Sequence, residues 1–265
     1  MKKFIVIGNP IKHSLSPQLH NYWINKNNIN AIYEKKEIKE EEISSIINQI
    51  KQKEINGINV TVPFKKTIIR HLDELSEEAE DTQSVNTVCL EHNKVVGYNT
   101  DIKGFELGIK NFNIDLKNKI VLILGSGGVV SSIIYALKKM KVSKIIISNR
   151  TKENTNYLKK LFEGLIIVDW GEIPEFDIVI NATSVGLKKE DNLKLNFSKV
   201  GKNKFFYDVI YNPSETHFLK TGKDLENKVE NGKYMFIYQA LASFKLWHGI
   251  EPEINSEVIK LLDRW

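Results

Sequence analysis

Three glycines at a predicted strand-to-helix turn carry the most specific chemical signal in this sequence. Gly125, Gly127 and Gly128 follow an apolar run at 120–124 and precede a helix-like run. Glycines at such a turn let the backbone of a helix N-terminus approach a pyrophosphate. A second apolar run at 144–148 completes a strand–helix–strand pattern that is typical of a dinucleotide site.

The residues after the second apolar run indicate which dinucleotide would bind. NAD-binding chains usually place Asp or Glu here to hold the ribose 2′-hydroxyl, whereas this chain reads Asn149-Arg150-Thr151-Lys152. A guanidinium beside a hydroxyl suits a 2′-phosphate, which a carboxylate would repel. The sequence therefore predicts NADP(H). The alternative is that Arg150 is a surface residue and Thr151 a helix N-cap.

Two serines could bind a small carboxylate. Ser14 and Ser16 stand at the start of a helix predicted at 16–27, after a strand predicted at 3–8. Hydroxyls and backbone N–H groups at a helix N-terminus are suitable donors to an anion. The alternative is that Ser16 only caps the helix, with Pro17 at its first position.

A lysine and an aspartate supply a candidate proton-transfer pair. Lys65 follows a strand predicted at 57–60, and Asp101 follows a strand predicted at 94–98. Ligands bind at strand ends in α/β sheets, and a carboxylate can hold a catalytic ammonium in place. Asn86 adds an amide near a third strand end. Without Asp101 and Asn86 nearby, Lys65 would be interpreted as a surface charge.

The order of the predicted elements indicates the fold class. Strand-like and helix-like runs alternate along the whole chain, which favours an α/β fold with two domains. The predicted strands are 3–8, 31–38, 57–60, 85–90, 94–98, 120–124, 144–148, 165–168, 177–181 and 204–208. The predicted helices before the last thirty residues include 16–27, 41–51, 66–71, 74–81 and 101–113.

Composition excludes several classes of protein. The 265 residues are 42% hydrophobic and 27% charged, as in ordinary globular chains. The net charge of +5 comes from lysines scattered among glutamates, so we expect no nucleic-acid partner. No apolar run approaches the roughly 20 residues of a membrane span, so no membrane partner is expected. The single cysteine, Cys89, fits a reducing cytoplasm.

Taken in order, these segments resemble the shikimate dehydrogenase family over nearly the whole chain. The matching segments are Gly8–Asn21, Asn59–Lys65, Val85–Thr87, Asn99–Asp101, Gly125–Gly128, Asn149–Thr151, Asn181–Ser184, Asp208–Pro213 and Gln239. The resemblance implies an N-terminal α/β substrate domain (1–101) and a Rossmann-type NADP-binding domain (102–235). The C-terminal helices (236–265) would pack back on the first domain.

The resemblance also implies a role for each matched residue. Lys65 would be the catalytic acid/base, paired with Asp101. The substrate, shikimate or 3-dehydroshikimate, would be bound by Ser14, Ser16, Thr61, Asn86, Asp101, Tyr211 and Gln239. The cofactor would be bound by Gly125, Ser126, Gly127, Gly128, Val129, Asn149, Arg150, Thr151, Lys152, Thr183, Val209 and Gly232. No metal is expected.

The implied activity is the reversible NADPH-dependent reduction of 3-dehydroshikimate to shikimate, a step of aromatic amino-acid biosynthesis. One alternative is a quinate/shikimate dehydrogenase that uses NAD or NADP. Arg150 argues against this alternative, whereas Asn154, which stands where many relatives carry a second basic residue, argues for it. The other is a non-catalytic ligand-sensing homologue, against which the presence of both Lys65 and Asp101 argues. The chain is expected to be a cytoplasmic monomer or homodimer.

Overall fold

The computed structural model describes residues 1–188 and 190–263, which form two compact units. Unit 1 contains Met1–Gly104 and the described residues from Ile237 onward, and unit 2 contains Phe105–Phe236. The chain changes unit within helix α4 (Asp101–Asn111) and again within helix α8 (Lys233–His248). The predicted two-domain α/β class is confirmed. The boundaries at 101/102 and 235/236 stay a prediction.

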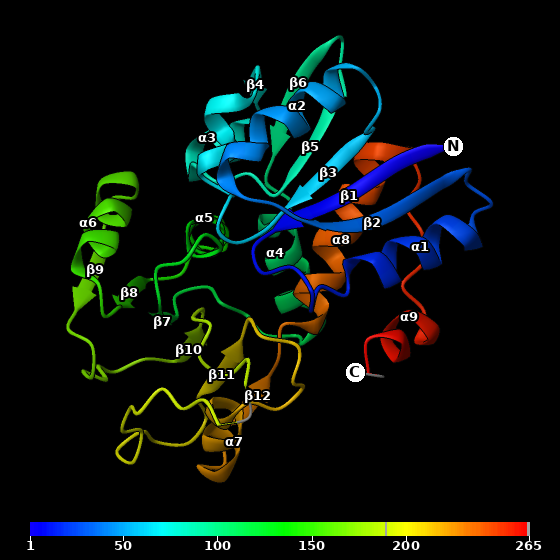
Figure 1. Cartoon of the computed structure of the whole chain (residues 1–265). Helices are drawn as coiled ribbons and strands as arrows, with labels where there is room; N and C mark the ends of the chain where they lie inside the picture. The colour runs from blue at the N-terminus through cyan, green and yellow to red at the C-terminus, as the bar shows by residue number, and fades with distance from the viewer. Residues whose placement is uncertain (189, 264–265) are drawn as a thin grey trace. The chain divides into compact units, whose positions relative to one another are not determined.

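Unit 1 is built on a mixed six-stranded sheet in the order β2-β1-β3-β5-β6-β4 (Figure 1). Strand β1 pairs in parallel with β2 and β3, whereas β5 is antiparallel to β3 and β6. Left-handed φ angles of 47° at His92 and 65° at Asn93 form the tight turn between β5 and β6. The strands are β1 Lys2–Gly8, β2 Ala31–Glu37, β3 Gly57–Val60, β4 Glu74–Leu75, β5 Thr87–Glu91 and β6 Lys94–Tyr98.

Helices cover both faces of this sheet (Figure 1). On one face, the isoleucines of α2 (Ile43–Lys51) pack with Ile58 and Val88 in a buried core. The short helices η1 (Glu40–Glu42), η2 (Thr67–His71) and α3 (Glu77–Thr82) complete the helices between β2 and β5. On the other face lie α1 (Ser16–Lys26) and α8, and α9 (Ser256–Leu261) contacts α1.

Two predictions for unit 1 were wrong in detail. Residues 74–81 do not form one helix, because Glu74 and Leu75 pair with β6 as strand β4. Helix α3 begins only after Ser76, whose hydroxyl accepts a hydrogen bond from the Ala79 N–H. Ser16 is the first residue of α1 and not its N-cap; Leu15 occupies the cap position and makes no side-chain cap bond.

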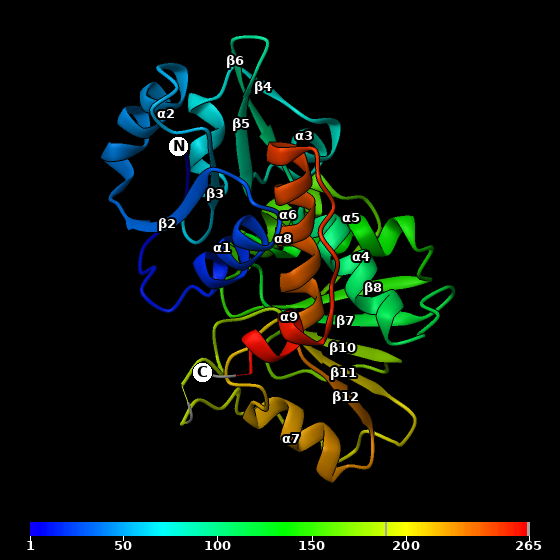
Figure 2. The same ribbon diagram turned by 90° about the vertical axis from the view of Figure 1, so that its right-hand side faces the viewer.

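Unit 2 is built on a sheet of six parallel strands in the order β12-β11-β10-β7-β8-β9 (Figure 2). Numbered within the unit, this order is 6-5-4-1-2-3, which is that of the doubly wound dinucleotide-binding fold. The strands are β7 Ile120–Leu124, β8 Lys144–Ser148, β9 Leu165–Val168, β10 Ile178–Asn181, β11 Phe205–Asp208 and β12 Lys228–Glu230. Strand β12 was not predicted.

Apolar residues pack on both faces of the second sheet. Helix α7 (His217–Asp224) places Phe218 against Phe206 of β11, with ring centroids 5.3 Å apart. On the opposite face, Phe105 of α4 meets Tyr207 edge-on at 5.8 Å. Helices α5 (Val130–Lys139) and α6 (Lys152–Leu161) connect β7 to β8 and β8 to β9. Within the described residues, no helix combines the length and apolarity needed to cross a membrane.

One buried histidine in unit 1 lies in an aromatic cluster. The ring of His20 stacks on Tyr33 at 4.2 Å and meets the edge of Trp23 at 5.9 Å. Neither ring nitrogen of His20 has a hydrogen-bond partner among the described residues. Burial, and secondarily the charge of His248, lowers the pKa of His20 to about 3.

We predict that replacing His20 by Phe reduces the acid sensitivity of unit 1. Below the ordinary histidine pKa of about 6.5, the unfolded chain binds a proton that folded His20 does not, so lowering the pH reduces the free energy of unfolding. At pH 5 this single group costs about 2 kcal/mol relative to pH 7. The wild type should therefore lose more stability between pH 7 and pH 5 than His20→Phe.

Urea unfolding followed by tryptophan fluorescence measures this difference, since Trp23 and Trp247 both lie near His20. The variant keeps some acid sensitivity, because burial and the charge of Lys2 lower the pKa of His248 to about 4. Equal losses of stability in the two proteins would mean that folded His20 accepts a proton.

Candidate active site

A buried ion pair is the most reactive feature of unit 1. The Lys65 ammonium donates a hydrogen bond to the Asp101 carboxylate. The two side chains are only 11% and 7% exposed, respectively. The Lys65 carbonyl accepts the N–H of Val85 at 2.8 Å, and Asp101 is the first residue of α4. A lysine held in this way can give or take a proton at an adjacent oxygen.

An amide orients the carboxylate of this pair. The Asn86 side-chain nitrogen Nδ2 donates to Asp101 Oδ1 at 2.9 Å and lies 3.4 Å from Gln239 Oε1. The Asn86 Oδ1 accepts the backbone N–H of Thr100 at 2.8 Å. The structure thus brings Lys65, Asp101, Asn86 and Gln239 together, although they come from four separate segments of the chain.

Ser14, Ser16 and Thr61 lie where the parallel strands β1 and β3 end. Thr61 directly follows β3, and its N–H donates to the Ile7 carbonyl of β1 at 3.0 Å. The last residue of β1 is Gly8, where a Cβ atom would lie 2.5 Å from Thr61 Cγ2. The segment from Gly8 leads to the start of α1, where the Ser16 N–H donates to Ser14 Oγ at 3.3 Å.

In unit 2, the glycine turn follows β7 and is shaped to admit a ligand. Gly125 has a φ of 110°, and a Cβ there would lie 2.9 Å from the Ala182 carbonyl oxygen, so only glycine fits well. At Gly127 the nearest atom would be 3.9 Å from a Cβ. Val129, at the N-cap of α5, makes no side-chain cap bond. This open turn before a helix suits a pyrophosphate.

The basic segment after β8 presents one unpaired cation. Lys152 pairs with Asp169 at 2.9 Å, with both side chains exposed. Arg150 is exposed, and no ion pair joins it to another described residue. Thr151 occupies the N-cap of α6, but its hydroxyl makes no cap bond. Asn149 donates to the Thr151 carbonyl at 2.9 Å. Arg150 and Thr151 are therefore available to a phosphate.

The turns after β10 and β11 lie at the same edge of the parallel sheet as the two segments just described. Thr183 follows β10, and its hydroxyl donates to Asn181 Oδ1 at 2.7 Å. Gly232, which follows β12, donates its N–H to the carbonyl of Ile210 in the turn after β11, at 3.2 Å. Tyr211 stacks on Phe236 at 4.4 Å. Tyr211 thus belongs to unit 2, unlike the other six residues predicted to bind substrate.

A buried carboxylate shapes the turn after β11, and sequence reasoning assigned it no role. Asp208 accepts hydrogen bonds from the Thr216 hydroxyl at 2.6 Å and the Ile210 N–H at 3.0 Å. The Asn181 side-chain nitrogen donates to both Asp208 oxygens at 3.1 Å. Burial raises the pKa of Asp208 to about 6 despite these bonds. The only sequence signal was its position at a strand end, in Asp208–Pro213.

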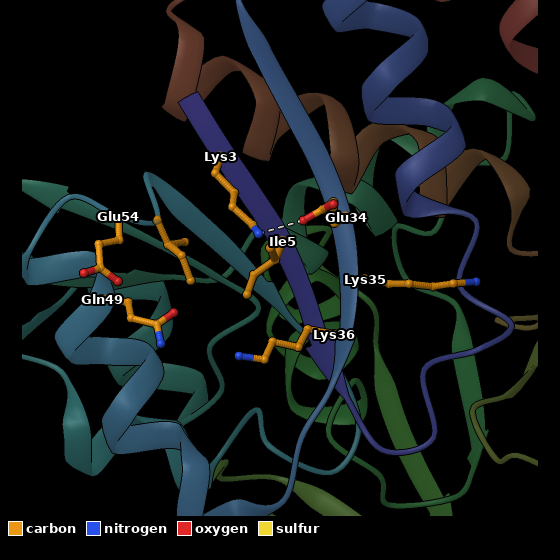
Figure 3. Close-up of a pocket in the computed structure, with 8 residues that line it drawn as sticks. Lys3, Ile5, Glu34, Lys35, Lys36, Gln49 and Glu54 are labelled. Atoms are coloured by element: carbon orange, nitrogen blue, oxygen red, sulfur yellow. Dashed lines mark ion pairs between the residues drawn. The ribbon is translucent and has the colours of Figure 1, made fainter. Parts of the chain in front are cut away.

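A hollow of about 310 Å³ in unit 1 contains none of the predicted site residues. Figure 3 shows it between β1, β2 and α2, with Lys3, Lys36, Gln49 and Glu54 around it. The Lys3 ammonium pairs with Glu34 at 2.8 Å. Since neither residue of the buried Lys65–Asp101 pair lines it, this hollow is not the candidate active site.

Comparison with family models identifies relatives along the chain. Residues 6–88 match the model described as the shikimate dehydrogenase substrate binding domain. Residues 106–213 match the model described as shikimate/quinate 5-dehydrogenase. The NADP⁺ shikimate dehydrogenase of Pelagibacter ubique (strain HTCC1062) is 58% identical over 262 residues, which cover 99% of each chain.

Solved structures give the same result. Shikimate dehydrogenase from Aquifex aeolicus superposes with a TM-score of 0.91 at 38% identity, covering 100% of this chain and 98% of that one. The shikimate 5-dehydrogenase of Thermus thermophilus, solved in complex with NADP(H) and shikimate, gives a TM-score of 0.90 at 30% identity. It covers 100% of this chain and 99% of the other.

We predict that Gly232→Ala destabilises unit 2, whereas Gly201→Ala does not. A Cβ at Gly232 would lie 2.1 Å from the Val209 carbonyl oxygen, so the backbone must shift, at a cost of about 1–3 kcal/mol. A Cβ at Gly201 would meet no atom within 4 Å, and its effect should stay within about 0.5 kcal/mol. Calorimetric melting of both variants compares them. Similar melting temperatures would show that the turn after β11 yields easily.

Proposed function

Because the chain belongs to the shikimate dehydrogenase family, we propose that it catalyses the reversible NADPH-dependent reduction of 3-dehydroshikimate to shikimate. This reaction serves aromatic amino-acid biosynthesis, and we place it in the cytoplasm. The observation that carries the proposal is the buried Lys65–Asp101 pair, held by Asn86 beside Gln239. Acid/base chemistry on a polyol needs a positioned proton donor and acceptor, which this pair supplies, whereas a protein that only binds its ligand needs none.

We assign substrate binding to side chains of matching chemistry. The substrate is a carboxylate, for which Ser14 and Ser16 offer hydroxyl donors and the N-terminus of α1. Thr61, Asn86, Asp101 and Gln239 supply amide, hydroxyl and carboxylate groups for the ring hydroxyls. Tyr211 stays a predicted substrate-binding residue, on the family resemblance alone.

The residues of unit 2 fit NADP(H). The glycine turn (Gly125–Val129) leaves room for a pyrophosphate at the start of α5. Asn149, Arg150, Thr151 and Lys152 place positive charge and donors at the end of β8, where an acidic residue would repel a 2′-phosphate. We assign Thr183, Val209 and Gly232 to the nicotinamide end. When bound, this cofactor supplies or accepts the hydride.

Lys65 acts as the general acid in one direction of the reaction and as the general base in the other. In the reductive direction, negative charge develops on the carbonyl oxygen, and the Lys65 ammonium donates a proton to it. In the oxidative direction, the neutral amine takes the proton from the substrate hydroxyl. Asp101 accepts a hydrogen bond from the lysine in both directions, so the nitrogen stays aimed at the reacting oxygen.

Steady-state absorbance at 340 nm with shikimate or quinate, and with NADP⁺ or NAD⁺, tests the proposal. Shikimate with NADP⁺ should give the highest kcat/KM. Comparable rates with quinate or NAD⁺ would favour the dual-specificity alternative, to which the uncharged Asn154 on exposed α6 points. Ligand binding without turnover would favour the sensing homologue. Light scattering decides between the two oligomeric states left open, a monomer and a homodimer.

Lys65→Ala should lower kcat at least about 100-fold, the usual contribution of a positioned acid/base group. The KM for shikimate should stay within about tenfold, because the lysine acts mainly on charge that develops in the transition state. The matched control is Lys66→Ala, the adjacent lysine, which the proposal gives no role. A near-normal kcat in Lys65→Ala would reduce Lys65 to a binding residue.

Arg150→Ala should reduce kcat/KM for NADP⁺ far more than for NAD⁺, by on the order of 2 kcal/mol, since only NADP⁺ carries the 2′-phosphate. Lys152→Ala should change the ratio much less, because Lys152 is exposed and already pairs with Asp169. Measuring both cofactors with both variants separates the two cations. An unchanged NADP⁺/NAD⁺ ratio in Arg150→Ala would locate phosphate recognition elsewhere.

A further inference from the structure

Three buried hydroxyl groups of unit 1 form a cluster that the proposed mechanism does not use. They belong to Thr87 in β5, Thr100 just before α4 and Ser243 in α8, and each residue is at most 5% exposed. The Thr87 and Ser243 oxygens are 2.8 Å apart, those of Thr100 and Ser243 3.2 Å, and those of Thr87 and Thr100 3.3 Å. We call these three residues the hydroxyl cluster.

The amide of Asn59 fixes one side of the hydroxyl cluster. Asn59 Nδ2 donates to Thr87 Oγ1 and to Ser243 Oγ, both at 3.0 Å, and to the Asn86 carbonyl at 3.1 Å. Asn59 Oδ1 accepts the Tyr33 hydroxyl at 2.7 Å. A reversed Asn59 amide would place its oxygen against the Asn86 carbonyl oxygen, which repels it, so the orientation of the amide is fixed.

The amide of Asn86 lies on the other side of the hydroxyl cluster. Asn86 Oδ1 accepts the Thr100 N–H at 2.8 Å and lies 3.1 Å from each threonine hydroxyl oxygen, Thr87 Oγ1 and Thr100 Oγ1. This arrangement turns Nδ2 toward Asp101 Oδ1, 2.9 Å away. A reversed amide would place its oxygen against the carboxylate and its N–H₂ group against the Thr100 N–H, and both contacts repel.

The hydroxyl protons can all be satisfied in this orientation. Thr87 donates to Asn86 Oδ1 and accepts the Ser243 hydroxyl, while Thr100 donates to Ser243 Oγ and accepts Asn86 Nδ2 at 2.9 Å. In this arrangement each hydroxyl group has an acceptor, and both ends of the Asn86 amide are bound. A fully satisfied buried network of this kind specifies one arrangement of its members, whereas a broken one leaves polar groups unpaired.

We propose that Thr87, Thr100 and Ser243 are positioning residues that lock the Asn86 amide with its N–H₂ group on Asp101. They act on proton transfer through Asn86, without touching the substrate. Asn86 occupies one carboxylate oxygen and thereby leaves the other to Lys65. The inference rests on the proposed function, since it assigns a consequence to the same Lys65–Asp101 pair.

Two substitutions at Thr87 separate its hydroxyl from its shape. Thr87→Val keeps the volume and removes the hydroxyl, whereas Thr87→Ser keeps the hydroxyl and removes a methyl group. Thr87→Val should lower kcat about tenfold, with the KM for shikimate within about threefold, because the amide that orients Asp101 is loosened. Thr87→Ser should keep kcat within about threefold of the wild type.

Val88→Ala is the matched control for simple destabilisation of β5. Val88 is fully buried, belongs to the hydrophobic core on the α2 face and has no place in the network. This variant should lower the melting temperature and leave kcat within about twofold of the wild type. If Thr87→Val does not fold, Ser243→Ala replaces it, with the same expected loss of kcat.

The proposal is overturned if Thr87→Val keeps full kcat, if Thr87→Ser falls as far, or if Val88→Ala loses as much kcat. A wild type without shikimate turnover would instead refute the proposed function. NMR tests the fixed orientation of the Asn86 amide directly, by measuring the hydrogen-exchange rate of its side-chain N–H₂ group. Slow exchange in the wild type and fast exchange in Thr87→Val would support the lock; equal exchange would overturn it.

Discussion

Keeping an ammonium and a carboxylate together in a largely buried site is the constraint on which unit 1 depends. Desolvation penalises both charges, and their attraction offsets this only when the remaining polar atoms also find partners. The Lys65 backbone is tied to Val85, and Asp101 receives the Asn86 amide. The surrounding polar network thus serves the same pair, which explains why so many amide and hydroxyl groups are buried between β3, β5 and α8.

In unit 2 the candidate ligand-binding positions are loop residues at one edge of the sheet rather than a buried ion pair. Because its strands are all parallel, the turns after β7, β8, β10 and β11 come to one edge, where backbone groups and a few side chains suffice to bind a ligand. At Gly125 and Gly232 the neighbouring backbone lies too close to admit a Cβ atom, so these positions require glycine. At Arg150 the positive charge of the side chain is what the predicted phosphate would need. Asp208 adds a buried anchor that ties the turn after β11 to β10 and to the start of α7.

The sequence predicted the two-domain class and most strands because apolar runs and glycine turns are local signals. Lys65 and Asp101 could be paired in advance because both follow strand ends. The hydroxyl cluster could not be predicted, since Thr87 and Ser243 are 156 residues apart and no local pattern relates them. Strand β12 could not be predicted, because its three residues, Lys228–Glu230, contain only one apolar side chain and so show no apolar run. Ser16 resembled an N-cap, but the backbone begins the helix at Ser16 itself.

The discontinuity of unit 1 has a consequence for how the protein is made on the ribosome. Unit 2 is one continuous stretch, so all its strands emerge in succession, whereas unit 1 takes its last helices from residues after Ile237. Until these are translated, the partners that Ser243 gives to Asn59 and Thr87 are missing, and Phe244 and Trp247 do not yet cover His20. The first domain to be synthesised is therefore the last to complete its core, and the nascent chain must carry this unfinished face through most of translation.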